Sequence, residues 1–351
     1  MAYMSTDADN RTERVMPAEW ERQSAVQLTW PHAHTDWRGC MPEITAVYVA
    51  LASAVSSFER LLIVTPRPDD VRASLLPVLT PAQMSRVTFH RCDTDDTWAR
   101  DHGFITVRDG GRLRLLDFRF NGWGEKYAAG LDNAVNRSLY DSGIMEGSYE
   151  YHGDFVLEGG AVESDGAGTL MTTVCCMTAP HRNEPLRRED IDGELRRRLG
   201  AGRVIWIDAR PLTGDDTDGH IDTLVRFAPD DTMLYVHADD PRDEHYDALL
   251  HMERQLRQLR TADGRPYRLV RLPMPDAVYH EGERLPASYA NFLVINDAVI
   301  IPTYGQPRND AMAVETISAA FPDRRPVTVD SRVLIRQHGS VHCCAMQYFL
   351  K

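Results

Sequence analysis

The sequence predicts a mixed α/β protein in which one unit, a strand hairpin followed by a helix and a further strand, recurs along the chain. Apolar runs of strand length flank short turns such as Asp109-Gly110-Gly111 and Asn296-Asp297. Helical patterns follow several of these hairpins. Units of this kind can close into a ring with their loops at the centre, which would let distant segments share a site.

The expected elements follow from apolar periodicity and turn residues. Residues 1–15 are polar and are predicted to be disordered, and residues 16–351 are predicted to form a single domain. Helices are expected over 43–58, 69–79, 131–143, 188–200, 243–261 and 309–320. Strands are expected over 60–66, 86–92, 103–107, 112–120, 154–164, 168–176, 203–208, 223–229, 232–238, 267–273, 291–304 and 327–330.

Composition narrows the class of protein. Of the 351 residues, 43% are hydrophobic and 26% are charged, which is ordinary for a soluble globular protein. The formal net charge of −13 makes nucleic-acid binding unexpected. We find no signal peptide and no apolar run near the roughly 18 residues of a membrane helix. The six cysteines form no CxxC pair, which indicates reduced thiols and a cytoplasmic protein.

Sequence motifs for nucleotide binding are missing. No G-x-G-x-x-G opens a helix after a strand, and Gly166-Ala167-Gly168 falls in a hairpin turn instead. The chain also lacks a P-loop. A Rossmann fold is therefore disfavoured.

An acidic segment, Asp215-Asp216-Thr217-Asp218-Gly219-His220-Ile221-Asp222, is the first candidate site. It fits the calcium-loop pattern poorly, because position 214 is glycine and no glutamate follows Gly219 at the required spacing. A solvated acidic turn explains Asp215 and Asp216. His220 and Asp222 instead enter an extended run, where a spacing of two would place both on one strand face toward a substrate.

Two further segments carry candidate groups. Trp98 and Asp101, in the sequence DTWARD, would suit a planar cation, although a polar loop is the plainer interpretation of the acids before them. Glu158, followed by two glycines, marks either a β-turn or an acid that orients His220.

The segment HGSVHCC, residues 338–344, is the last candidate. A cysteine in an apolar strand is more often a small buried hydrophobe than a nucleophile, and Cys175-Cys176 is a second such pair in an expected strand. A thiol, a histidine and several carboxylates are nevertheless the groups needed for attack on a cationic carbon. A guanidinium is such a group, since it is planar, permanently charged and bidentate toward carboxylates.

Six motifs in order along the chain resemble the agmatine deiminase and bacterial (Porphyromonas-type) peptidylarginine deiminase family of the guanidine-modifying superfamily. They are DDTWARD (95–101), FNGWGEKY (120–127), LEGG (157–160), DGHID (218–222), SYANF (288–292) and GSVHC (339–343). With MPAEWERQ near the N-terminus, the resemblance covers almost the whole chain. It implies a five-bladed α/β-propeller (pentein) of pseudo-fivefold ββαβ modules around a central active site.

The resemblance also implies roles for individual residues. Cys343 would be the nucleophile and His220 the general acid and base. Asp101 and Asp222 would grip the guanidinium, and Glu158 would be the acid near His220.

Substrate contacts are implied in the same way. Trp98 would form a wall of the substrate slot, and Asn291 would be a polar neighbour of the reacting centre. Asp96, Asp215 and Asp216 could receive the amine of agmatine, and Trp123 of the FNGWGEKY motif would be a further substrate contact.

The implied activity is hydrolysis of agmatine to N-carbamoylputrescine and ammonia through a covalent cysteine thiouronium. Alternatives are a deiminase of free or peptidyl arginine or of another guanidine, an amidinotransferase, a metal-dependent hydrolase built on residues 215–222, and a non-catalytic guanidine-binding module. No cofactor and no metal are expected. The expected partner is a small cationic guanidine, without nucleic acid or membrane, and a homodimer or higher homo-oligomer is compatible with this interpretation.

Overall fold

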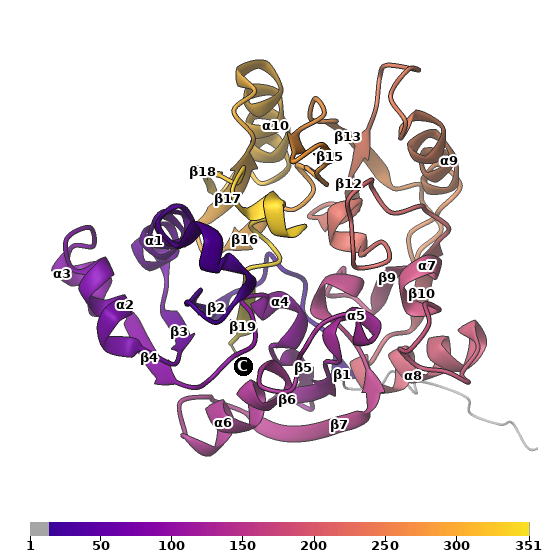
Figure 1. Ribbon diagram of the computed structural model, residues 1–351. Coiled ribbons are helices and arrows are strands. Elements are labelled where there is room, and N and C mark those ends of the chain that lie inside the picture. The colour runs from indigo at the N-terminus through magenta and orange to yellow at the C-terminus, as the bar shows by residue number, and fades with distance from the viewer. Residues whose placement is uncertain (1–13, 351) are drawn as a thin grey trace, which may run out of the picture.

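The computed structural model describes residues 14–350, which form a mixed α/β fold (Figure 1). Five of its six sheets share one pattern, in which a strand pairs antiparallel with the next strand and that strand pairs parallel with a third. Four of these sheets contain β5 (Ile105–Asp109), β6 (Arg112–Arg119) and β7 (Ser148–Val156); β8 (Glu163–Ser164), β9 (Thr169–Thr173) and β10 (Arg203–Ile207); β11 (Val225–Ala228), β12 (Thr232–His237) and β13 (Arg268–Pro273); and β16 (Leu293–Ile295), β17 (Ala298–Thr303) and β18 (Arg325–Asp330).

The fifth sheet joins the two ends of the chain. Its strands are β19 (Ala345–Phe349), β2 (Gln23–Thr29), β3 (Leu61–Thr65) and β4 (Val87–Arg91). The C-terminal β19 pairs antiparallel with the N-terminal β2, and β2 pairs parallel with β3. The sixth sheet is the small hairpin of β14 (Tyr279–His280) and β15 (Glu283–Arg284). The pairing of β19 with β2 brings the last residues of the chain beside the first strand of the core.

A helix connects the two parallel strands of each of the five sheets, as expected for parallel pairs. These helices are α1 (Met41–Phe58), α6 (Val135–Asp141), α8 (Arg188–Leu199), α9 (Tyr246–Leu256) and α10 (Pro307–Ala320). Shorter helical segments are η1 (Asp36–Cys40), α2 (Pro68–Leu75), α3 (Pro81–Met84), α4 (Ala99–His102), α5 (Gly122–Glu125), η2 (Asp132–Ala134), η3 (Gly159–Ala161), α7 (Val174–Met177), η4 (Ile221–Thr223) and η5 (Leu334–Gln337). In Figure 1 the sheets surround the middle of the molecule, and α2, α6, α8, α9 and α10 lie toward its edge.

Most expected elements are confirmed, including the hairpins around Asp109-Gly110-Gly111 and Asn296-Asp297. Several expectations were wrong, and three of them are corrected first. Arg14–Val15 is ordered as β1 and pairs with β5, whereas the rest of the segment predicted to be disordered lies outside the described residues. Cys175 and Cys176 lie in α7 rather than in a strand, because the Thr173 side chain caps the Cys176 N–H and starts a helical turn.

The third error concerns the apolar segment Asp36–Phe58. By length and composition alone this helical segment could cross a membrane, so the statement that no run approaches this length was wrong. Its residues Ile44, Tyr48 and Leu51 are fully buried in the core that contains β2 and β3. That burial is typical of the core helix of a globular fold.

Candidate functional site

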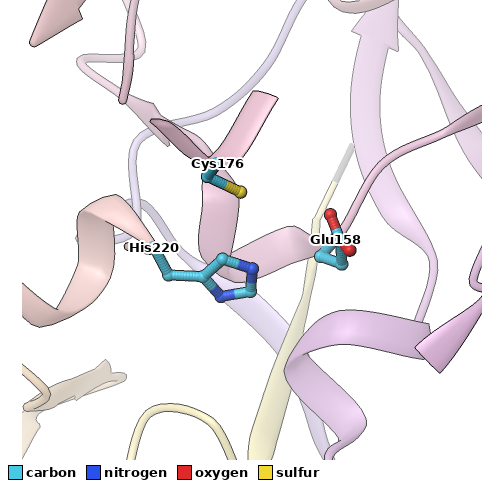
Figure 2. A group of neighbouring side chains, drawn as sticks. All are labelled: Glu158, Cys176 and His220. Carbon is cyan, nitrogen blue, oxygen red and sulfur yellow. The ribbon is translucent and has the colours of Figure 1, made fainter. Parts of the chain in front are cut away.

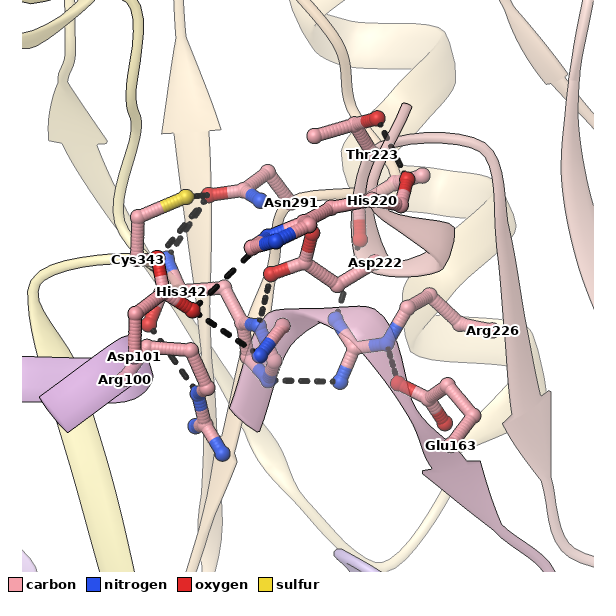
Figure 3. Close-up of polar contacts among 12 residues, drawn as sticks. Arg100, Asp101, Glu163, His220, Asp222, Thr223, Arg226, Asn291, His342 and Cys343 are labelled. Carbon is pink, nitrogen blue, oxygen red and sulfur yellow. Dashed lines mark hydrogen bonds and ion pairs between the residues drawn. The ribbon is translucent and has the colours of Figure 1, made fainter. Parts of the chain in front are cut away.

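Cys343 lies in the turn that precedes β19, not in a strand. The N–H of Arg100 donates to the Cys343 carbonyl at 3.1 Å, which ties this turn to α4. The Sγ atom lies 3.4 Å from Asn291 Oδ1 (Figure 3), and the residue is only 6% exposed. Burial, and the nearby charges of Asp222 and Asp101, raise the pKa of the thiol well above its ordinary value. The thiol is therefore neutral until something stabilises the thiolate.

Asp222 lies in the 3₁₀ turn η4 and His220 directly precedes that turn, so the expected strand with a spacing of two was wrong here. The turn forms because side chains bind the backbone before it: Asp215 accepts from the Gly219 N–H at 2.7 Å, and Thr217 Oγ1 accepts from the His220 N–H at 3.1 Å. His220 and Asp222 are both buried. The prediction that both belong to one site does not depend on the strand, because the turn also places them together (Figure 3).

Gly160 marks the point at which the polar groups converge. A Cβ atom there would lie 2.5 Å from His220 Nδ1, 2.9 Å from Asp101 Oδ1 and 3.1 Å from Asp222 Oδ2. All three atoms therefore border the same small space, and any residue larger than glycine would enter it. The second glycine after Glu158 therefore keeps this space free of a side chain, in addition to marking a turn in the sequence.

Asp101 is fixed by two donors. Trp123 Nε1 donates to Oδ2 at 3.0 Å, and the Gly160 N–H donates to Oδ1 at 3.0 Å. His220 Nδ1 lies 3.7 Å from Asp101 Oδ1. Burial lowers the pKa of His220, but Asp101, Cys176 and Glu158 together outweigh burial, so the pKa lies well above its ordinary value. The imidazole is consequently a protonated acid in the free protein.

Glu158 is near His220 but does not hydrogen-bond to it. Its carboxylate accepts from Arg182 Nε at 3.0 and 3.3 Å, and Arg182 also binds Asp218 at 2.6 Å. Both His220 ring nitrogens lack a hydrogen-bond partner within residues 14–350. The expectation that Glu158 orients His220 is thus not matched by a direct contact. Arg182 was missed, since no sequence pattern marks it.

A cavity opens over these groups. It is lined by Trp98, Asp101, Trp123, Asp215, Asp216, Thr217, His220, Thr223, Gln337, His338, Gly339 and Cys343. Trp98 and Trp123 provide its aromatic walls, as the motifs implied. None of the twelve lining residues is lysine or arginine, and two acids, Asp215 and Asp216, add to Asp101.

Two of the expected substrate contacts are already engaged by the protein. Asp96 does not line the cavity; it accepts from Trp98 Nε1 at 3.1 Å, and burial raises its pKa to about 7. Asp216 does line the cavity, but its carboxylate accepts from Tyr127 at 2.9 Å. Asp96 therefore positions the Trp98 wall and does not face the space itself.

A buried charged network lies behind Asp222 and was missed in the sequence. His342 Nδ1 lies 2.6 Å from Asp222 Oδ2, and His342 Nε2 lies 2.8 Å from Glu19 Oε2. Arg226 binds Glu19, Glu163 and the His342 ring (Figure 3). The only sequence signal for this network was His342 itself, directly before Cys343.

The comparisons with known proteins agree with this site. Residues 15–348 match the Porphyromonas-type peptidyl-arginine deiminase family. The chain belongs to that family. An agmatine deiminase from Ectopseudomonas mendocina is 32% identical, with 95% of this chain and 94% of that protein covered.

Solved structures of similar proteins extend the family match to the whole fold. A C. jejuni agmatine deiminase, solved as a cysteine-to-serine variant with substrate bound, is 36% identical with a TM-score of 0.88, covering 96% of each chain. A candidate arginine deiminase from Porphyromonas gingivalis is 47% identical with a TM-score of 0.90, covering 96% of this chain and 98% of that one. Members of this deiminase family thus share the mixed α/β fold described here.

Proposed function

We propose that this protein is an agmatine deiminase that hydrolyses the guanidinium of agmatine to a urea, giving N-carbamoylputrescine and ammonia. The observation that carries the proposal is the convergence of Cys343, His220 and Asp101 at one acidic, tryptophan-walled cavity. The buried Asp222 lies beside His220 and Asp101 around Gly160. A thiol, a proton donor and two carboxylates are the groups that attack on a guanidinium carbon requires.

The two carboxylates are proposed to hold the guanidinium. Asp101 Oδ1 accepts a hydrogen bond from the Gly160 N–H, and Asp101 Oδ2 accepts one from Trp123 Nε1. Asp222 Oδ1, by contrast, is buried and has no hydrogen-bond partner within the described residues. A buried carboxylate oxygen without a donor is costly, and a guanidinium N–H would satisfy it. Binding the cation between these residues also offsets the two negative charges that raise the pKa of Cys343. Substrate binding therefore favours the thiolate.

The first half of the reaction makes the covalent intermediate. The Cys343 thiolate adds to the guanidinium carbon and forms a C–S bond, giving a tetrahedral adduct. Protonated His220 donates its proton to one nitrogen of the adduct, the C–N bond breaks, and ammonia leaves. The product is a thiouronium on Cys343 and a neutral His220.

The second half releases the urea. Neutral His220 takes a proton from water, and the water oxygen adds to the thiouronium carbon. The second adduct collapses with cleavage of the C–S bond, which returns Cys343 as a thiolate, and its hydroxyl proton leaves to solvent, which gives the carbonyl of the urea. His220 is again protonated, so the cycle closes without a further reactant.

The cavity lining supports agmatine over arginine. Agmatine carries an amine at its far end, which suits the acids Asp215 and Asp216, whereas free arginine adds a carboxylate that would seek a basic partner. The two arginines considered from the sequence do not supply one: Arg100 is bound to Gln347, and Arg119 lies in β6 outside the lining.

Arginine remains the second candidate because of one specific observation. The candidate arginine deiminase from Porphyromonas gingivalis is 47% identical, compared with 36% for the C. jejuni agmatine deiminase. The deciding experiment compares agmatine, free arginine and a blocked arginine peptide side by side, with EDTA present, and measures ammonia and the urea group. Preference for agmatine supports the proposal, and preference for an arginine substrate would overturn the substrate assignment while keeping the chemistry.

We further propose that the five like sheets are the blades of a five-bladed α/β-propeller. The repeated antiparallel-then-parallel pairing and the β19–β2 pairing between the chain ends support this arrangement. In such a ring the turn before β19, η4 and α4 would all meet at the central axis. A single blade assembled from both chain ends would also make the terminal segments essential for the site.

A further inference from the structure

Cys176 is a second thiol beside the proposed catalytic histidine. Cys176 of α7 is fully buried. In Figure 2 it lies above the His220 ring, and Glu158 lies to the right of both residues. One ligand atom from each of Glu158, Cys176 and His220 lies within 4.8 Å of the others. The proposed reaction uses the histidine but has no use for this thiol.

We propose that Glu158, Cys176 and His220 form an inhibitory site for a thiophilic divalent cation such as Zn²⁺. Thiolate, imidazole and carboxylate are the three protein ligands that Zn²⁺ binds. The site is more than a lone cysteine, because both His220 ring nitrogens are buried without a hydrogen-bond partner in the described chain. Such a nitrogen next to a thiol can act as a ligand once the ion displaces its proton.

The spacing is close to what Zn²⁺ requires. Bond lengths of about 2.0–2.3 Å put ligand atoms of a tetrahedral site roughly 3.3–3.8 Å apart, and the three ligand atoms here lie within 4.8 Å, so the side chains need to close by about 1.5 Å at most. The cavity over Cys343 reaches His220, which gives the ion a route to the site. A water molecule from the cavity can complete the coordination.

Arg182 is the main charge that opposes a cation here, since it binds Glu158. Its guanidinium is also paired with Asp218, which offsets part of its charge. Asp101 contributes a further negative charge 3.7 Å from His220 Nδ1. On binding, Zn²⁺ displaces the protons of Cys176 and His220, so thiolate and carboxylate together balance the charge of the ion.

The site is expected to be inhibitory because one of its ligands, His220, is the proposed general acid and base; this part of the proposal rests on the proposed function. A metal-bound imidazole can neither donate a proton to the leaving ammonia nor accept one from water. The expected effect is therefore loss of kcat that EDTA reverses. Metal binding itself does not depend on the proposed function and is measured without turnover.

The test measures Zn²⁺ binding by titration calorimetry and Co²⁺ binding by its thiolate-to-metal absorption, on the full-length protein. Cys176→Ser is expected to weaken Zn²⁺ binding by at least about 100-fold and to remove the thiolate absorption. Cys175→Ser, the neighbouring half-buried thiol outside the group, is the matched control and keeps both signals. In Cys343→Ser, the absorption is expected to persist, which also tests the site if the Cys176 variant fails to fold.

Two results would overturn the proposal. Loss of the absorption in Cys343→Ser with retention in Cys176→Ser would place the ion on the proposed nucleophile instead. Failure of the wild-type protein to bind Zn²⁺ or Co²⁺ would remove the site altogether. If the protein binds Zn²⁺ as expected but turns over no guanidine, the metal site stands and the proposed function fails.

Discussion

His342 Nδ1 lies 2.6 Å from Asp222 Oδ2, and this contact fixes one of the two carboxylates that are proposed to hold the guanidinium. The other ring nitrogen of His342 contacts Glu19, which Arg226 binds in turn. Since Oδ2 is engaged, Asp222 presents its unpartnered Oδ1 to a ligand. The histidine before the proposed nucleophile is thus a positioning residue that does not itself line the cavity.

The first prediction concerns this positioning contact. Burial raises the pKa of Asp222, but the hydrogen bond and charge of His342 outweigh it and keep the pKa below its ordinary value. His342→Phe removes that donor, so the pKa of Asp222 rises and substrate binding requires a higher pH. The acid limb of the kcat/KM profile is expected to move to higher pH. His90→Gln, which alters a histidine bound to Ser138, is the control; an unmoved profile in His342→Phe would contradict the assigned role.

The second prediction separates the adjacent thiols. Cys343→Ala is expected to lower kcat by at least about 10³-fold, because it removes the nucleophile. Cys344→Ala is expected to keep most of the activity and to lose roughly 1 kcal/mol of folding free energy, since Cys344 is fully buried in the apolar core. Turnover assays and thermal unfolding distinguish the two effects. An inactive Cys344 variant beside an active Cys343 variant would move the nucleophile by one residue.

The third prediction concerns the grip on the cation. Asp222→Asn keeps the shape of the side chain but removes the charge that binds the guanidinium. The expected loss in kcat/KM is about 10²–10³-fold, the scale of a buried charge-assisted contact that strengthens in the transition state. Asp240→Asn alters an exposed acid bound to Arg242 and is expected to be silent. Near-equal activity of the two variants would refute the role of Asp222.

The fold followed from local patterns where turns and periodicity were unambiguous. Asp109-Gly110-Gly111 and Asn296-Asp297 predicted hairpins, and both are present. The run HIDTLVRF was expected to be extended from its first residue, yet Ile221–Thr223 form η4 and the strand begins only at Val225. That turn depends on Asp215 and Thr217 binding the backbone, and side-chain to backbone bonds of this kind compete with a strand without changing its apolar pattern.

The site was harder to predict than the fold from local sequence patterns. No spacing rule connects Cys343 with His220, and only the ordered motifs of a known family suggested that they meet. Arg182 and Glu19 bind their partners across long stretches of sequence, Arg182 to Glu158 and Glu19 to His342. Such contacts are set by packing of whole units, which apolar periodicity does not encode.

The last prediction tests a buried acid away from the site. Glu59 is 6% exposed and accepts from Asn296 Nδ2 at 2.8 Å, and burial raises its pKa from 4.5 to about 8. Between these values the folded protein keeps a proton that the unfolded chain releases, so stability falls as pH rises from 4.5 to 8. Glu59→Gln removes this titration and is expected to be more stable than wild type at pH 9, by roughly a few kcal/mol at most.

Chemical unfolding measured from pH 5 to pH 9 provides the test. The wild-type free energy of unfolding should decline with pH relative to Glu59→Gln, and the difference should level off above about pH 8. Asp240→Asn, which changes an exposed acid paired with Arg242, is the control and should parallel wild type. Parallel curves for wild type and Glu59→Gln would show that Glu59 is ionised in the folded protein across this range. The Asn296 contact would then be the stronger influence, because a hydrogen bond to the charged carboxylate opposes the effect of burial.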